Sequence, residues 1–530
     1  MCGFIPYILS TRGQQQNVGE IIEKGACMDS NGGNLRFILG LKVKQYRQKK
    51  GYSLKDVAER TGVSISFLSE IEKGKKYPKP EKIMQLARAL EITFDDLVSL
   101  KVDKELDALT SLWDSPFLKE FPFELFGITP RDLMELMTTS PSKAGAFLRT
   151  FLEIGQTYDM RVEHFLLAAL RSYQKMNQNY FQDIEEAVNA FLKEQKWTPQ
   201  PTVSFESLCA IFTDKYGLTL EESDFARFPA LQGFRSIWVD GDPKKLIINS
   251  NLMPNQKAFI LGREIGYSYL KLRERARTSS WIKVESFEQV LNNFKASYFA
   301  GALLISRDLL RRDLAQFFKK KRWDGEGFLG LMHQYNATPE MFLYRLSQLI
   351  PRFFGLNEIY YIRFNNITGK DSFHLTKDLN MSRVPVPHGI GLNEHYCRRW
   401  LSITLLKELA KDHKPEGGAE IIVATQRSRF VESDAEFLTI TLARPLVLSQ
   451  RTNSSISFGF LIDDDLKRVV KFWQDPTIPK IDVNETCERC GLVESACSDR
   501  VAPPVLYDMK QKQLIQENTL QDFLQEMEDV

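Results

Sequence analysis

The sequence predicts a multidomain protein with an all-α head and helical linker, an α+β middle part and an α/β C-terminal part that carries a cysteine-rich region. A chain of 530 residues has room for about three to four domains, at roughly 100–200 residues for each. Hydrophobic residues make up 43% and charged residues 26%, which is an ordinary balance for a globular protein. The hydrophobic period changes from helical spacing before residue 200 to short strand-like runs after it.

The expected domains follow these changes in pattern. Residues 1–34 are rich in Gly, Gln and Asn, which indicates a flexible extension, and Met28 leaves open whether residues 1–27 are present in the native protein. After this extension we expect a basic helical domain at 35–100, a helical region at 101–200, an α+β domain at 201–325, a sensor domain at 326–460 and a cysteine-rich region at 461–530.

Periodicity also predicts individual elements within these domains. Helical spacing predicts five short helices in 35–100, helices over Val162–Tyr173, Tyr180–Leu192, Pro254–Arg273 and Phe287–Leu304, and a final acidic helix from about Leu520. Short apolar runs predict strands at Ser236–Val239, Lys245–Ile248, Glu358–Phe364, Ala419–Ala424, Leu438–Leu448 and Ser455–Phe460.

The net charge of +2 hides an asymmetry between one segment and the rest of the chain. Residues 36–82 hold thirteen Lys and Arg against five Asp and Glu, a balance of +8 that leaves −6 for the remainder. A basic module on an acidic body suits a nucleic-acid partner. The longest apolar run, near Phe299–Ile305, is far shorter than the ~20 residues of a membrane helix, and no secretory signal is visible. We therefore expect a soluble, cytoplasmic protein with no membrane partner.

The basic segment contains the pattern of two short helices joined by a glycine turn. Ser53 can cap the first helix, and Gly62 can take the positive φ of the turn. Ser64 can cap the second helix, Ile65–Lys73, which Gly74 ends. This is a helix-turn-helix, whose second helix lies in the major groove of DNA.

The run from Leu41 to Leu97 resembles repressor-type helix-turn-helix domains of the xenobiotic-response-element class. The matching residues are Arg47, Ser53-Leu54, Ala58, Gly62-Val63-Ser64, Leu68-Ser69, Ile71-Glu72, Gly74 and Pro80. The resemblance implies a DNA-binding transcriptional regulator. Because one such domain buries little DNA surface, we expect a homodimer or higher oligomer on a double-stranded, two-fold operator.

The second helix supplies the residues that we expect to read sequence. Ile65 can touch a thymine methyl group, and Glu70 can accept a hydrogen bond from cytosine N4. Serines can bond several base edges, whereas lysines favour phosphates, which position the domain. The predicted DNA-contacting set is Lys44, Ser53, Ser64, Ile65, Ser66, Ser69, Glu70, Lys73, Lys75 and Lys76.

The middle part resembles the ImmA/IrrE-type metallopeptidase domain around its zinc helix. That helix carries His-Glu-x-x-His, and here Arg263 and Tyr267 stand at the two ligand positions beside Glu264. Lys295 stands where the family has its third ligand. A cation and a phenol cannot replace imidazoles on zinc, and Glu264 has no metal-bound water to activate. We therefore expect a degenerate domain and no enzyme activity.

Three of the seven cysteines cluster near the C-terminus, in the spacing C-x2-C-x6-C. Thiolates at such spacing can converge on one metal ion or cluster. Cys397 is the best remote candidate for a fourth ligand, and His395 is its possible substitute. Cys2, Cys27 and Cys209 are expected to take no part. The predicted ligand set is Cys397, Cys487, Cys490 and Cys497.

The cysteine region resembles the C-terminal part of short-chain fatty acyl-CoA regulators. The match continues through Arg500 to Pro504 and includes the upstream Cys397-x-x-Trp400 element. The resemblance implies a PAS-like sensor region that binds acyl-CoA and a 4Fe-4S iron–sulfur cluster on the four cysteines. Zinc is the alternative metal, since four thiolates suit either.

Together these features predict a sequence-specific transcriptional regulator that senses a short-chain acyl-CoA or a related metabolite. One alternative is a redox or iron sensor, in which the cluster itself is the signal. Another is a metal-dependent peptidase that cleaves a repressor, which requires metal ligands where Arg263 and Tyr267 stand.

Overall fold

The computed structural model describes residues 30–74, 76–99, 122–128, 150, 153, 162–198, 202–278, 284, 286–386, 391, 394–411, 421–433 and 435–528. The chain divides into two compact units, of which the second consists of Glu120–Pro122 and Asp159–Val530. Residues 1–29, most of the predicted extension, lie outside the described residues. Among the described residues, no helix combines the length and apolar character needed to cross a membrane.

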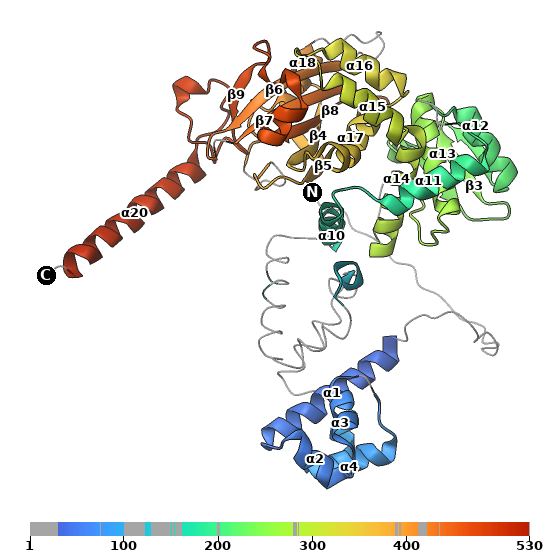
Figure 1. Ribbon diagram of the computed structural model, residues 1–530, viewed down its shortest axis with the longest axis vertical. Coiled ribbons are helices and arrows are strands. Elements are labelled where there is room, and N and C mark those ends of the chain that lie inside the picture. The colour runs from blue at the N-terminus through green and yellow to red at the C-terminus, as the bar shows by residue number, and fades with distance from the viewer. Residues whose placement is uncertain are drawn as a thin grey trace, which may run out of the picture. The chain divides into compact units, whose positions relative to one another are not determined.

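In the described part of the first unit (Figure 1), residues 35–100 contribute to five helices, as predicted. These are α1 (Ser30–Lys49), α2 (Leu54–Thr61), α3 (Ile65–Glu72), α4 (Pro80–Leu90) and α5 (Phe94–Val98), with a later 3-10 turn η1 (Phe123–Phe126). Helix α1 begins at Ser30, so the expected boundary after residue 34 falls inside it. The low helix propensity of Asn and Gly in this stretch hides the start of the helix.

One apolar core holds the five helices together. It consists of Leu39, Val43, Val57, Val63, Leu68, Ile71, Ile83, Leu86, Ala87, Leu90 and Leu97. Helices α1 and α3 are in close contact at Gly40, where an added Cβ would lie 2.3 Å from the Ile71 carbonyl oxygen. Only glycine allows the two helices to cross at this distance.

The N-terminal half of the second unit combines helices with a three-stranded sheet of order β1-β3-β2. Its elements are α10 (Val162–Met176), α11 (Gln182–Glu194), α12 (Phe205–Ala210), a π-turn η2 (Ile211–Lys215), β1 (Thr219–Ser223), η3 (Phe225–Arg227), η4 (Pro229–Leu231), β2 (Ser236–Val239), β3 (Lys245–Asn249), α13 (Pro254–Tyr269) and α14 (Phe287–Leu304). The predicted β2, β3 and α14 are confirmed.

Helix α13 is shorter than its predicted span to Arg273. It ends at Tyr269, and Lys271 takes a positive φ of 55° while the Leu272 N–H donates to the Tyr267 carbonyl. This left-handed turn satisfies the last carbonyls of the helix without a glycine to announce it. Strand β1 was not predicted, because its five residues contain a single apolar side chain, Leu220.

The C-terminal half is built on a six-stranded sheet of order β5-β4-β8-β7-β6-β9, in which β6 and β9 alone run parallel. Its elements are α15 (Arg307–Phe317), α16 (Gly325–Gln334), α17 (Pro339–Phe354), β4 (Ile359–Ile367), β5 (Phe373–Asn380), α18 (Leu401–Lys411), β6 (Ile422–Phe430), β7 (Glu436–Leu446), β8 (Ser449–Leu461), α19 (Asp464–Val469), η5 (Lys471–Gln474), β9 (Lys480–Val483), η6 (Glu494–Ala496) and α20 (Val505–Glu528). Because β9 joins this sheet, the sheet continues past the expected boundary at residue 460.

The two faces of the sheet are covered by different helices (Figure 1). Neighbouring residues of a strand point to opposite faces. The Tyr360 ring meets Trp400, just before α18, at a centroid distance of 5.9 Å, whereas the Tyr361 ring meets Tyr344 of α17 at 5.4 Å. Gly459 leaves room for the Tyr360 ring, since an added Cβ would lie 2.2 Å from it.

Candidate functional site

Helices α2 and α3 begin at the caps that the sequence predicts. The Asp56 N–H donates to Ser53 Oγ at 3.2 Å, and the Ser53 N–H donates to Asp56 Oδ2 at 2.8 Å, which completes a capping box. Gly62 ends α2 with a φ of 62°, and Ser64 Oγ accepts from the Phe67 N–H at 3.2 Å. The predicted helix-turn-helix is therefore confirmed, with α3 ending at Glu72, one residue early.

Helix α3 has a buried apolar face and an exposed polar face. Leu68 and Ile71 lie in the core, while Ile65 is 47% exposed between the exposed Ser64 and Ser66. Further residues of the predicted set, Ser69 and Glu70, are half-buried, and Ser53 at the start of α2 is exposed. A short helix with hydroxyl groups around one exposed apolar side chain has the chemistry that reads base edges.

The predicted phosphate-contacting lysines lie around this helix. Lys73 and Lys76 are exposed, Lys44 on α1 is half-buried, and Lys75 lies outside the described residues. Lys76 Nζ lies 2.8 Å from a Glu70 carboxylate oxygen and 5.5 Å from the centroid of the Phe67 ring. The carboxylate that we expect to read cytosine is therefore held by a lysine in the DNA-free protein.

Two cations of the basic segment support the frame of the domain. Arg47 donates to both carboxylate oxygens of Glu72, at 2.6 and 2.8 Å, and to the Tyr52 carbonyl at 2.9 Å. The buried Lys42 ammonium donates to the carbonyls of Asp96 and Ser99, each at 2.6 Å. Hydrogen bonding to Glu72 raises the pKa of Arg47, so this charge is permanent.

On α13, which resembles the zinc helix, ion pairs occupy the place of the metal ligands. Glu264 is 1% exposed, accepts from Arg263 Nη2 at 3.0 Å and is also paired with Arg275. The Arg275 guanidinium stacks 3.6 Å from the Trp238 ring centroid and 4.6 Å from that of Tyr267. Burial raises the pKa of Tyr267 to about 12, so its phenol stays neutral. Lys295 lies half-buried on α14. These side chains do not fit a zinc site.

Arg275 is a residue that the sequence analysis missed. It lies in the loop after α13, outside the helical motif, and only the fold brings its guanidinium to Glu264. No local spacing signals such a contact.

The fold brings Cys397 to the C-terminal cysteine region. Tyr396 and Thr486 pair as an isolated antiparallel bridge, the Cys397 N–H donates to the Glu485 carbonyl at 3.1 Å, and the Cys487 N–H donates to the His395 carbonyl at 2.9 Å. Two segments that are distant in the sequence are thereby fixed side by side, with one cysteine from each at the junction.

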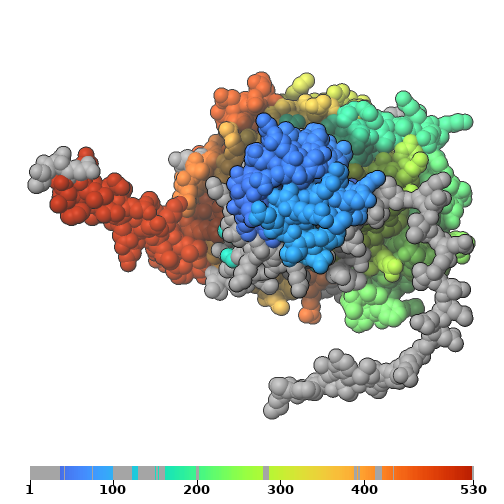
Figure 2. Space-filling view, turned by 90° about the horizontal axis from the view of Figure 1, so that it is seen from below, coloured from blue at the N-terminus to red at the C-terminus, as the bar shows by residue number. Residues whose placement is uncertain are grey.

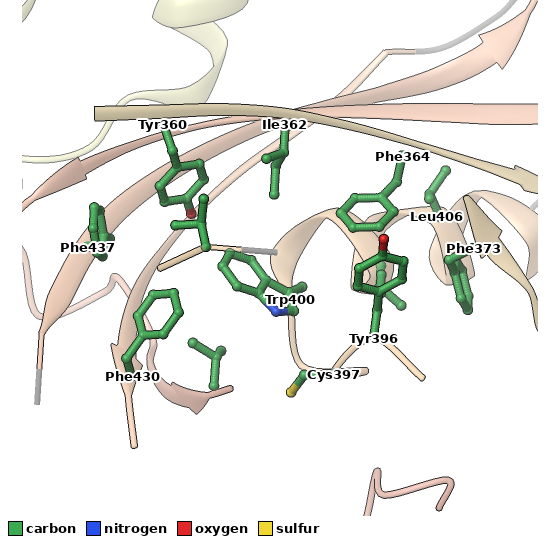
Figure 3. Close-up of a cluster of buried hydrophobic side chains, with 13 residues drawn as sticks. Tyr360, Ile362, Phe364, Phe373, Tyr396, Cys397, Trp400, Leu406, Phe430 and Phe437 are labelled. Atoms are coloured by element: carbon green, nitrogen blue, oxygen red, sulfur yellow. The ribbon is translucent and has the colours of Figure 1, made fainter. Parts of the chain in front are cut away.

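All four predicted ligands are buried free thiols, with exposed fractions between 3% and 7%. Burial raises the pKa of Cys397 to about 11, and the neighbouring Cys487 and Cys490 add to the rise. Burial likewise raises the pKa of Cys490, which interacts with Cys487 and Cys497. In Figure 3, Cys397 lies at the edge of the aromatic core with its sulfur pointing away from Tyr360 and Ile362.

Arg500 and Trp400 fix the backbone around these thiols. The Arg500 guanidinium donates to the carbonyls of Cys487, Cys490 and Leu492, at 3.3, 3.1 and 2.5 Å. Trp400 is fully buried and donates from Nε1 to the Asn484 carbonyl at 2.8 Å. The two motif residues that accompany the cysteines thus hold the turns that carry them.

The donor chemistry at this junction fits a thiolate-bound metal. Four buried thiols with no disulfide among them are the soft donors that zinc and iron–sulfur clusters prefer. Within the described part of the chain, no three His, Cys, Asp or Glu side chains are already arranged as a metal-binding group. The substitute candidate His395 has its Nδ1 2.7 Å from a Glu488 carboxylate oxygen, so this ring is engaged elsewhere.

Comparisons with known families match two parts of the chain. Residues 43–97 match the helix-turn-helix family, and residues 215–347 match the IrrE N-terminal-like domain. The second match begins after the expected start of the middle domain and ends beyond its expected end at residue 325. It therefore includes α16 and part of α17.

Individual relatives match the helix-turn-helix end of the chain. The chain is similar to the HTH-type transcriptional regulator SinR of Bacillus licheniformis, 35% identical over 80 residues, which is 15% of this chain and 72% of the relative. It is equally similar to SinR of Bacillus subtilis (strain 168), 35% identical over 79 residues, 14% of this chain and 71% of the relative. A solved Mycobacterium tuberculosis transcriptional regulator aligns at a TM-score of 0.42 and 16% identity, covering 63% of this chain and 92% of that chain.

Proposed function

Since this chain belongs to the helix-turn-helix-type transcriptional regulators and binds DNA, we propose that its second unit senses a short-chain acyl-CoA or a related metabolite and adjusts operator binding. The exposed polar face of α3 is the observation that carries the DNA-reading role. For the ligand to act, it must favour one arrangement of two DNA-binding heads over another.

A PAS-like sensor region is supported by the architecture of the second unit. Five consecutive strands, β4 to β8, form one antiparallel sheet in which the first strand lies beside the last. One face of this sheet packs on Trp400 and α18, and the other packs on α17.

The sensing role is tested by operator binding of the full chain. Sequences selected from a random duplex library should contain a two-fold repeat, and affinity for the selected operator should change when acyl-CoAs of two to six carbons are added. Unchanged affinity across the whole acyl-CoA panel would contradict the sensing role.

We further propose that Cys397, Cys487, Cys490 and Cys497 hold a 4Fe-4S cluster, with zinc as the alternative. The bound metal supplies a covalent link between two distant chain segments, which stabilises the folded state. Arg500 and Trp400 orient the turns that present the thiols. If the cluster is itself the signal, oxidation changes operator affinity without any acyl-CoA.

Anaerobic purification with absorbance and metal analysis tests this site. We expect a coloured protein with iron and acid-labile sulfide, and loss of both in Cys490→Ser. The matched control is Cys209→Ser, because Cys209 is a half-buried free thiol outside the cluster. Colourless protein with stoichiometric zinc would contradict the iron–sulfur cluster and support zinc. Protein with neither iron nor zinc would contradict both proposals.

The proposed homodimer is supported by helix α20, which stands out from the second unit in Figures 1 and 2. Its base is anchored, because the N–H groups of Leu506 and Tyr507 donate to the Glu488 carbonyl and Lys510 pairs with Glu432 at 3.2 Å. At 100° per residue, one stripe gathers seven exposed apolar side chains. They are Val505, Leu506, Met509, Leu520, Phe523, Leu524 and Met527.

We propose that this stripe packs against α20 of a second copy, in antiparallel orientation. In the first half of α20, Lys510 and Lys512 outnumber Asp508, whereas the second half carries only acidic charges, from Glu517, Asp522, Glu526 and Glu528. An antiparallel pair places the basic half of each helix against the acidic half of the other, and favourable electrostatics selects this orientation over the parallel one.

Light scattering of size-separated protein tests the helix pair. Leu520→Glu places a charge in the stripe and should shift the protein to monomer. Leu514→Glu is the matched control, because Leu514 is exposed on the opposite side of α20 and should leave the dimer intact. A monomeric wild type, or a dimeric Leu520→Glu protein, would contradict the proposal.

A further inference from the structure

A cavity of about 320 Å³ lies in the second unit, beside the Arg263 end of the zinc-like motif on α13 and lined by none of the cysteines. Its walls come from α13, α14, α17 and strands β4 and β5, together with Arg235 just before β2. Among the described residues that line it, Glu340 alone carries a carboxylate, whereas five are cationic.

Two of these cations are neutralised by partners of their own. Arg345 is 1% exposed and donates to both oxygens of Glu185, at 2.6 and 3.0 Å. Arg263 is paired with Glu264 at 3.0 Å. They add hydrogen-bonding capacity to the wall but little net charge.

The remaining positive charge converges on Glu340. Arg444 Nη2, from behind the wall, donates to Glu340 Oε2 at 2.9 Å, and Arg363 Nη2 lies 3.5 Å from Oε1. Burial opposes ionisation of Glu340, but the charges of Arg444, Arg363 and Arg235 outweigh it and lower its pKa to about 2. One carboxylate is therefore shared by three guanidinium groups.

Lys377 adds a further cation at the rim of the cavity. Its stem is exposed, while its ammonium lies 3.5 Å from the centroid of the Tyr344 ring and 5.6 Å from that of Tyr361. Burial of the ammonium, and then the charge of Arg363, lower the pKa of Lys377 to about 7. The protein thus holds an ammonium beside like charges, at a cost that an anion would remove.

We propose that this cavity binds the phosphate-bearing end of a small molecule, with Arg235, Arg363 and Lys377 as its ligands. Arg363, Arg444 and Lys377 together outnumber the single carboxylate of Glu340, and charges removed from water are costly unless paired. The inference rests on the proposed function, in which the second unit senses a small molecule. A volume of about 320 Å³ is at the small end of ligand pockets, which suits a phosphate or pyrophosphate group.

Titration calorimetry of the full-length, metal-replete chain with inorganic pyrophosphate tests the cavity. We expect saturable binding that weakens at least tenfold in Lys377→Met and in Arg235→Gln. The matched control is Lys370→Met, since Lys370 is an exposed lysine on the turn between β4 and β5, outside the cavity.

Three results would overturn the proposal: no saturable binding to the wild type, equal binding by Lys377→Met, or an equal loss in Lys370→Met. Because the Lys377 stem is exposed, its replacement should leave the fold intact, and thermal melting without ligand checks this. If Lys377→Met does not fold, the same comparison is made between Arg235→Gln and Lys370→Met.

Two further titrations identify the source of the phosphate and separate this inference from the proposed function. Coenzyme A that binds more tightly than pyrophosphate, with the same loss in Lys377→Met, indicates the nucleotide end of an acyl-CoA. Pyrophosphate binding with coenzyme A excluded indicates a free phosphorylated metabolite. If the cavity binds an anion but operator affinity does not change, the anion site is supported and its role in sensing is contradicted. If Lys377→Met still responds to acyl-CoA, the sensing role is supported, but the acyl-CoA binds somewhere other than this cavity.

Discussion

Arg47 and Glu72 form a two-pronged ion pair in the interior of the first unit, with side chains only 13% and 6% exposed. The pair connects α1 to the end of α3, and Arg47 also donates to the Tyr52 carbonyl before α2. Removing one partner of such a buried pair destabilises the protein more than replacing both partners with apolar residues, because it leaves a buried charge without compensation.

Glu72→Ala should therefore destabilise the first unit by about 3–5 kcal/mol. The measurement is hydrogen exchange of peptides from α1 to α3 in the full-length chain, where protection should fall. The control is the double variant Arg47→Met with Glu72→Met, which keeps apolar volume and should lose less protection than Glu72→Ala. Equal protection in wild type and Glu72→Ala would contradict the expectation.

Lys377 makes anion binding depend on pH. The groups that face its ammonium are Arg363 and Tyr361 from β4 and Glu340 and Tyr344 from α17, of which none is expected to change charge between pH 6 and 9. The pKa of Lys377 is near 7, so the ammonium is charged below that pH and neutral above it.

Sulfate affinity should consequently be higher at pH 6 than at pH 9, because a cation is present at the lower pH and sulfate keeps its double charge throughout. Calorimetry across this range checks the sign, and the dependence should disappear in Lys377→Met. Tighter sulfate binding at pH 9 would show that Lys377 does not titrate in contact with the anion.

At the scale of elements, local signals predicted some structure and long-range pairing decided the rest. Ser53, Ser64 and Gly62 act on backbone groups within a few residues, so the ends of α2 and α3 can be predicted from the sequence. Strand β5 and strand β9 are edge strands, whose place depends on β4 and β6 rather than on their own pattern. Neither was predicted.

The long final helix shows the same limit. Its predicted start near Leu520 is wrong by 15 of the 24 residues, because α20 begins at Val505, directly after the Pro503-Pro504 pair. The glutamines at its centre interrupt the apolar pattern. The anion cavity has no sequence signal at all, because Arg235, Glu340 and Lys377 come from elements far apart in the chain.

The hydroxyl groups of α3 and the lysines that follow it should contribute to DNA binding in different ways. Ser66→Ala should change the preference for one base pair, whereas Lys73→Ala should weaken binding to all sequences alike and lower the slope of log affinity against log salt by about 1. Competition between operators with single base-pair changes measures both effects. A uniform loss in Ser66→Ala would contradict a base-reading role for this hydroxyl.

At the scale of the whole molecule, the charge asymmetry and the helix α20 both affect how operator affinity depends on salt concentration. A head with a balance of +8 binds DNA by displacing counterions, so affinity falls with salt in proportion to the number of phosphates contacted. Two heads contact about twice as many phosphates as one.

Operator affinity of the wild type should therefore fall by roughly three to five powers of ten between 50 and 200 mM salt, if six to ten phosphates are contacted. In Leu520→Glu, the slope of log affinity against log salt should be about half as steep. Leu514→Glu should keep the wild-type slope. An unchanged slope in Leu520→Glu would mean that the heads pair by another surface.

The pairing of Glu264 with Arg263 and Arg275 also determines what it would take to build a metal site into α13. Histidine at position 263 would leave Glu264 held by Arg275, and that guanidinium would still be stacked on Trp238, next to the site of the missing metal. Loss of Arg275 alone would leave a buried carboxylate with one partner fewer. Restoring histidines at positions 263 and 267 would therefore not by itself make a metal site, because Arg275 would still occupy the space beside Glu264.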